Sequence, residues 1–130
     1  MRVTQKTRCR IVVAGTDRVL ATRARVASSL VARMVGLLRD SHLEAGEGLI
    51  ITTCRSIHTF GMRFAIDAVF VDADWRVVAI WHALPPWRVT SCHWAARCVV
   101  ELPAGVAQHV RLNVGDRLEV TPVDRAKNSS

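Results

Sequence analysis

Apolar and polar residues alternate in short runs along the chain, and this pattern predicts a protein built mainly of β-strands. Residues 12–14 and 19–21 are apolar runs on either side of residues 15–18, where Gly15 and Asp17 are typical of a hairpin turn. Further apolar runs predict strands over residues 49–51, 66–71, 75–84, 98–102 and 118–120. Pro85 and Pro86 end the strand over 75–84, because proline has no backbone N–H to donate to a neighbouring strand.

Two segments have helical features instead. Ser28 and Ser29 are typical N-cap residues, and apolar side chains three and four positions apart follow them as far as Leu38. We therefore expect one main helix over about residues 28–39 and one short helix over about residues 104–110. Strands outnumber helices and mostly follow one another in sequence, which favours an α+β domain dominated by β-structure. We expect a compact single domain over residues 1–123, with a mostly antiparallel, barrel-like sheet of six or seven short strands, and a flexible tail over residues 124–130.

The positive charge is concentrated at the N-terminus. The 130 residues carry a formal net charge of +7, and residues 1–25 hold seven basic side chains against Asp17 alone. The remaining residues are close to neutral, with 11 basic and 10 acidic side chains. No aromatic residues stand among the N-terminal arginines, so we expect a solvated basic edge strand there and keep a nucleic-acid site only as an alternative.

Composition and hydropathy narrow the class of protein. Half of the residues are apolar and 22% are charged, which excludes intrinsic disorder. No apolar run approaches the roughly 18–20 residues of a membrane-spanning helix, and residues 11–14 are too short an apolar stretch for a secretory signal. We therefore expect a cytoplasmic protein whose cysteines are reduced.

Cysteine and histidine residues are the first candidates for chemistry. Zinc prefers thiolate and imidazole ligands, so a metal site is one hypothesis, and its candidate ligands are Cys54, His58, Cys92 and Cys98. Their spacing matches no zinc-finger or zinc-ribbon pattern, and isolated cysteines also serve as small apolar core residues. A second hypothesis is a catalytic Cys54–His58 pair, in which Asp67 orients the imidazole.

Two acidic residues lie inside predicted strands. A charge at Asp67, within the apolar run 66–71, is costly unless it is paired or hydrogen-bonded. Its carboxylate either accepts hydrogen bonds from loop amides or an arginine such as Arg97, or it is an acid within a pocket. Strand alternation turns Glu101 to the face opposite Val100. Trp87 and Trp94 flank a loop, and they form a binding surface if exposed or part of the core if buried.

Five short segments between about residues 26 and 120 resemble a known family. They are residues 33–38 (RMVGLL), 48–50 (GLI), 66–72 (IDAVFVD), 96–105 (ARCVVELPAG) and 113–116 (NVGD). In this order they are similar to segments of the small bacterial and archaeal family called domain of unknown function 192. The resemblance implies a compact β-rich, barrel-like fold in a bacterial protein, and it implies no established activity, cofactor or substrate.

The chain departs from this family in one place. Many members carry Phe-Trp-Met-Lys-Asn-Thr where residues 57–62 read IHTFGM, so no role of the missing Trp, Lys and Asn transfers to this chain. Cys54, His58 and Met62 resemble features of a subgroup. Family members often bear export signals, so the resemblance leaves an association with the cell envelope open.

Three functional hypotheses follow from the sequence. The leading one is a non-catalytic accessory module that holds an unknown protein or small-molecule partner near residues 54–67. Its candidate ligand-binding residues are His58, Met62, Asp67, Arg97 and Glu101. One alternative is a small hydrolase-like enzyme that uses Cys54 and His58 or a bound metal, and the other is nucleic-acid binding through the basic N-terminus. We expect no cofactor, with zinc as the alternative.

Overall fold

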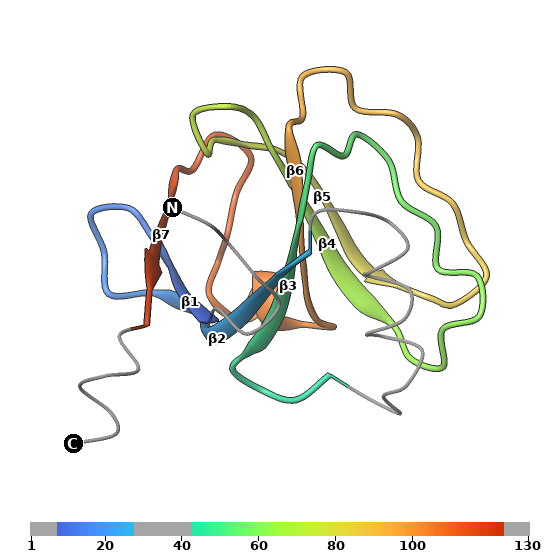
Figure 1. The fold of residues 1–130 in the computed structure, drawn as a ribbon, viewed down its shortest axis with the longest axis horizontal. Helices are drawn as coiled ribbons and strands as arrows, with labels where there is room; N and C mark the ends of the chain where they lie inside the picture. Colours follow the sequence, from blue (N-terminus) through green and yellow to red (C-terminus); the bar gives the residue numbers. More distant parts are fainter. Residues whose placement is uncertain (1–7, 28–42, 124–130) are drawn as a thin grey trace.

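The computed structural model describes residues 8–27 and 43–123 (Figure 1). Within these residues, seven strands form one sheet and a single short helix follows β6. The elements are β1 (Arg8–Val13), β2 (Val19–Ala27), β3 (Glu47–Thr52), β4 (Ile66–Val71), β5 (Val77–Leu84), β6 (Cys98–Pro103), α2 (Val106–His109) and β7 (Leu118–Pro122). The β-dominated fold and the short helix near residues 104–110 agree with the sequence-based expectation. The main helix expected over 28–39 and the tail expected over 124–130 lie outside the described residues.

The sheet is mixed rather than purely antiparallel. Its strand order is β5-β4-β6-β3-β2-β1-β7, and every neighbouring pair is antiparallel except β2 and β3. In that parallel pair, Arg25 lies opposite Leu49 and Ala27 lies opposite Ile51. A parallel pair requires a long crossover connection, and residues 28–46 provide one.

The expected barrel is wrong, because the two edges of the sheet are not joined into a continuous ladder. The edge strands are β5 and β7, and an isolated bridge between Arg76 and Arg117 links the residues just before them. The Val77 N–H donates to the Asp116 carbonyl oxygen at 2.8 Å beside that bridge. The expected basic edge strand is wrong as well. β1, which carries Arg8 and Arg10, lies between β2 and β7 and pairs with both.

Apolar residues cover both faces of the sheet. All six residues of β4 are buried, and β6 is buried as far as Leu102, which explains why both strands are nearly continuous apolar runs in the sequence. One core cluster contains Val69, Val100 and Leu102, and the other contains Phe70 and Val99. The described residues include no helix that is long and apolar enough to cross a membrane.

Candidate functional site

Two connections of the sheet run alongside each other and contain most of the candidate residues. Residues 53–65 connect β3 to β4, and residues 85–97 connect β5 to β6. We call these two segments the loop pair, and Figure 1 shows them side by side at the right of the molecule. Five backbone hydrogen bonds of 2.8–3.0 Å join them, from the N–H groups of Cys54, Thr59, Trp87, Thr90 and His93 to carbonyl oxygens of the other segment. These loops therefore hold each other in place.

Two buried threonine side chains add to this connection. The Thr59 hydroxyl donates to the Pro85 carbonyl at 2.7 Å and accepts from the Arg88 N–H at 2.9 Å. The Thr90 hydroxyl accepts from the Ile57 N–H at 3.1 Å. Backbone groups of irregular loops usually bind water. Here backbone groups of the two segments hydrogen-bond to each other instead, which indicates a preformed surface.

The loop pair is also anchored to the sheet through His93. The Trp81 indole Nε1–H of β5 donates to His93 Nε2 at 2.9 Å, so the imidazole carries its proton on Nδ1 when it is neutral. The His93 ring lies 4.5 Å, between centroids, from the ring of buried Phe70. The His93 imidazole is thus an interior contact of the loop.

The charge of the loop pair is entirely positive. Its 26 residues include four arginines, which are Arg55, Arg63, Arg88 and Arg97, and no aspartate or glutamate. All four arginines are exposed. The sequence shows that neither segment contains an acidic residue, but 19 residues separate the two segments, so the sequence does not reveal that they lie together.

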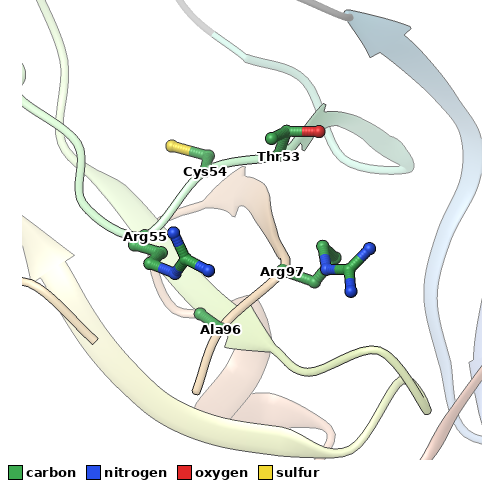
Figure 2. A pocket seen from close by; sticks show the side chains of 5 residues that line it. All are labelled: Thr53, Cys54, Arg55, Ala96 and Arg97. Carbon is green, nitrogen blue, oxygen red and sulfur yellow. The ribbon is translucent and has the colours of Figure 1, made fainter. Parts of the chain in front are cut away.

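A small cavity of about 210 Å³ lies at the base of the loop pair, next to the ends of β3 and β6. It is lined by Thr53, Cys54, Arg55, Ala96 and Arg97. In Figure 2 the Arg55 guanidinium points toward Arg97, the Arg97 guanidinium points away from Arg55, and the Cys54 sulfur points away from both. The Arg55 Nε–H donates to the Trp94 carbonyl at 3.2 Å, and within residues 8–27 and 43–123 no hydrogen bond from its terminal nitrogens is seen. The cavity therefore offers guanidinium donors, which suit a carboxylate or phosphate group.

Thr53 was missed by the sequence analysis, although its backbone distinguishes this cavity. Its φ is 55°, in the left-handed region that is unfavourable for a β-branched residue. Backbone strain of this kind persists where surrounding contacts hold the residue in the strained conformation, and it occurs more often at functional sites. The backbone strain at Thr53 thus marks the wall of the cavity as a specialised part of the loop.

Exposed aromatic residues gather on another part of the loop pair. The rings of Phe60 and Trp87 are stacked with centroids 6.0 Å apart, and the His58 ring lies 4.9 Å from that of Phe60. Phe60 is 45% exposed and Trp87 is 64% exposed. The neighbouring Val89, which pairs with His58 in an isolated bridge, is exposed too. We call these four residues the aromatic face. Phe60 and Val89 carry no local signal in the sequence that marks them as surface residues. Trp87 and Trp94, for which the sequence left exposure open, are both exposed.

Asp67 is not directed toward the loop pair. It is fully buried, and its Oδ1 accepts a hydrogen bond from the Ala83 N–H at 2.8 Å. Its Oδ2 accepts from the N–H groups of Gly105 and Ala107 at 3.1 and 2.9 Å. The donors are backbone amides, and the Arg97 side chain is not one of them. Asp67 thus holds the start of α2 and the bulged end of β5 against β4.

Glu101 and Met62 are also buried. Glu101 lies opposite Ala68 in the β4–β6 pair, so it faces the side of the sheet opposite to Asp67. This agrees with its expected position on the face opposite Val100. Met62 belongs to the same core cluster as Phe70. Of the five candidate ligand-binding residues, the structure leaves only the exposed Arg97 and the half-buried His58 at the surface of the loop pair.

The structure does not assemble the candidate metal ligands into a site. Among residues 8–27 and 43–123, no three His, Cys, Asp or Glu side chains are placed to hold a metal ion together. Cys98 is buried in β6 and Cys92 is exposed. Burial raises the pKa of Cys98, although a hydrogen bond to the Thr53 backbone and the Arg97 charge act in the opposite direction. The side chain of Cys98 therefore favours the neutral thiol form, as expected for a core residue.

The candidate catalytic pair is directed to backbone groups. The Cys54 thiol donates to the Ser56 carbonyl at 2.9 Å, and His58 Nδ1 accepts from the Phe60 N–H at 3.3 Å. Because the carboxylate of Asp67 accepts three backbone amides, it is not available to orient His58. The arrangement supports a fixed loop better than a nucleophile–base–acid triad.

The N-terminal arginines are partly used within the fold. The Arg18 guanidinium donates to the carbonyls of Val110 and Arg111, just after α2, at 2.8 and 3.0 Å. Arg23 forms an ion pair with Glu44 at 3.6 Å. The excess charge at this end of the sequence is therefore not a uniform free surface.

Comparison with known proteins places the chain in a family. The DUF192 family model, described as "Uncharacterized ACR", matches residues 11–120. The chain belongs to the DUF192 family. Among DUF192 relatives, UPF0127 protein PH1112 of Pyrococcus horikoshii is 32% identical over 98 residues, which are 73% of this chain and 84% of that protein. UPF0127 protein PYRAB11210 of Pyrococcus abyssi is 38% identical over 64 residues, which are 49% of this chain and 54% of that protein. The family predicted from the sequence is confirmed, whereas these archaeal relatives do not confirm a bacterial origin.

Two solved structures share the fold of this DUF192 chain. A protein of unknown function from Novosphingobium aromaticivorans has a TM-score of 0.72 and 20% identity, covering 86% of this chain and 83% of its own. A putative transcription regulator from Sinorhizobium meliloti has a TM-score of 0.75 and 20% identity, covering 92% of this chain and 98% of its own. At this identity the likeness is one of fold.

Proposed function

We propose that this DUF192 protein is a non-catalytic binding module, and that its ligand presents a carboxylate or phosphate group to the loop pair. The observation that carries this proposal is the cavity of about 210 Å³ with Arg55 and Arg97 in its lining. The surrounding loop pair contains no acidic residue that would neutralise them. Guanidinium groups bind both oxyanions through paired hydrogen bonds.

The rigidity of the loop pair supports binding rather than chemistry. Its backbone is fixed by the five hydrogen bonds between the segments and by the buried hydroxyls of Thr59 and Thr90. A preformed site loses little conformational entropy when it binds a ligand. Asp67, the acid that the sequence offered for catalysis, is buried within the sheet, and so is the candidate ligand-binding residue Glu101.

Isothermal titration with sodium tripolyphosphate and with citrate tests the proposal. We expect binding by the wild-type protein, and we expect Arg55→Ala and Arg97→Ala each to weaken it by about 3- to 10-fold, the effect of removing one partly solvated charged hydrogen bond. Arg117→Ala is the matched control, because Arg117 is an exposed arginine outside the loop pair. The proposal is wrong if neither anion binds at millimolar concentration, or if Arg117→Ala weakens binding as much as Arg97→Ala.

A further inference from the structure

The loop pair carries both exposed arginines and the aromatic face, and a small anion would use only the arginines. We propose that the anionic partner is a single-stranded nucleic acid, whose bases stack on Phe60 and Trp87 and whose phosphates contact the arginines of the loop pair. This inference rests on the proposed anion-binding function and names its partner. It concerns a different surface from the N-terminal arginines considered in the sequence analysis.

The geometry of the rings suits the stacking of a base. Phe60 and Trp87 are stacked at an interplanar angle of 26°, and both are exposed, Trp87 more than Phe60. The ring of His58 continues the group at 4.9 Å from Phe60. A stack of exposed rings has an outer face on which an unpaired base can continue the stacking, and every base has such a face.

Backbone contacts hold Trp87 in place. The Trp87 N–H donates to the Thr59 carbonyl at 3.0 Å, and the Thr59 N–H donates to the Arg88 carbonyl at 2.8 Å. Trp87 also has a φ of 64°, which is unfavourable for a bulky residue and is maintained by these contacts. An exposed tryptophan in a strained, fixed backbone indicates a side chain that is presented to a partner.

Exposed arginines accompany the aromatic face on the loop pair. Arg88 follows Trp87 directly, and the other exposed arginines lie on the same two segments, which contain no acidic residue. An acidic peptide would satisfy the arginines as well as a phosphate backbone does. The bases of a nucleic acid can also stack on the exposed ring of Trp87, whereas the carboxylates of an acidic peptide cannot, so the observations favour a nucleic acid over an acidic peptide. In a duplex the bases are already stacked, which favours the single strand.

Fluorescence anisotropy with a labelled mixed-sequence single-stranded 12-mer tests the inference. We expect wild-type protein to bind it more tightly than the same sequence as a duplex, and more tightly than a labelled 12-residue polyglutamate. The logarithm of the association constant is expected to fall against the logarithm of salt concentration with a slope of up to about −3, since four arginines each release about 0.7 counterion from a single strand.

Three variants isolate the contribution of the rings. Trp87→Leu keeps an apolar side chain without an aromatic face, and we expect it to weaken single-strand binding by about 5- to 150-fold, the range for one stacked base. Trp87→Phe retains a stacking face and is expected to restore most of the affinity. Val114→Ala is the control, because Val114 is an exposed apolar residue in the turn before β7. Circular dichroism checks that each variant is folded.

The outcomes separate this inference from the function on which it rests. Equal affinity for the single strand and polyglutamate, or full affinity in Trp87→Leu, overturns the nucleic-acid inference and leaves anion binding standing. Equal affinity for the single strand and the duplex overturns it in the same way. Failure of the oligonucleotide, polyglutamate, tripolyphosphate and citrate to bind overturns both proposals.

Discussion

Replacement of Asp67 by asparagine tests whether this buried carboxylate is a structural anchor. In the structure it joins three parts of the chain, because it lies in β4 and accepts hydrogen bonds from the amides of Ala83, Gly105 and Ala107. Asparagine has nearly the same shape but only one acceptor oxygen. It can therefore keep the hydrogen bonds from the Gly105 and Ala107 amides only if its own NH2 group faces the Ala83 N–H.

The expected loss of stability follows from these contacts. One amide loses its acceptor, which costs about 1–3 kcal/mol when the group is buried. The two remaining hydrogen bonds change from a charged to a neutral acceptor, and each weakens by up to about 1 kcal/mol. The lower desolvation cost of a neutral side chain offsets part of this loss. We therefore expect Asp67→Asn to lower the free energy of unfolding by about 2–4 kcal/mol, and Asp67→Ala to lower it further.

Urea denaturation at pH 7, followed by circular dichroism, measures this change. Asp72→Asn is a matched control, because Asp72 accepts the Asp74 and Arg76 amides through Oδ1 alone, in a turn at the surface, and asparagine retains that oxygen. We expect the control to change stability by less than about 0.5 kcal/mol. A loss below about 0.5 kcal/mol for Asp67→Asn as well would refute the assignment of Asp67 as an anchor.

Two further predictions concern other buried groups. Trp81→Phe removes the hydrogen-bond donor to His93 Nε2. We expect it to lower the free energy of unfolding by about 1–2 kcal/mol and to speed proteolysis within residues 85–97. An unchanged rate of cleavage there would contradict the anchoring role of Trp81. Burial raises the pKa of Cys9 and Cys98 above their ordinary value of 9.0, so above pH 9.0 the unfolded chain releases protons that the folded chain retains. The free energy of unfolding is therefore expected to fall as pH rises from 9.0 through the pKa values of the folded state. When the free energy of unfolding is measured by urea denaturation at each pH, the double variant Cys9→Ala, Cys98→Ala should show a smaller decrease.

The central strands were predictable because they are buried on both faces. Residues 66–71 form a continuous apolar run apart from Asp67, and they coincide with β4 as found. β2 was underestimated, since only residues 19–21 were expected, whereas the strand continues to Ala27. Its middle contains the exposed residues Thr22 and Arg23, which interrupt the apolar pattern. The parallel pairing of β2 with β3 was beyond local patterns, because it depends on the path of the connection between them.

Individual residues of the candidate site were predictable, but their assembly was not. Cys54 and Arg97 both attracted attention in the sequence, and the backbone hydrogen bond from the Cys54 N–H to the Arg97 carbonyl brings them to the same cavity. Backbone hydrogen bonds between irregular loops leave no periodic signal in the side chains, so local patterns do not reveal such contacts. The same limitation applies to the stack of Phe60 on Trp87, since 27 positions separate them in the chain.

The division between interior and exterior groups within the loop pair is the strongest reason to regard it as a recognition surface. The hydroxyls of Thr59 and Thr90 and the imidazole of His93 are directed inward and hydrogen-bonded. Phe60, Trp87 and Trp94, which are large apolar side chains that a stable fold would more readily bury, face solvent together with the four arginines. The interior contacts account for the rigidity of the loops, but they do not require Trp87 or the four arginines to be exposed. Those exposed side chains are better explained by a partner that contacts them from outside.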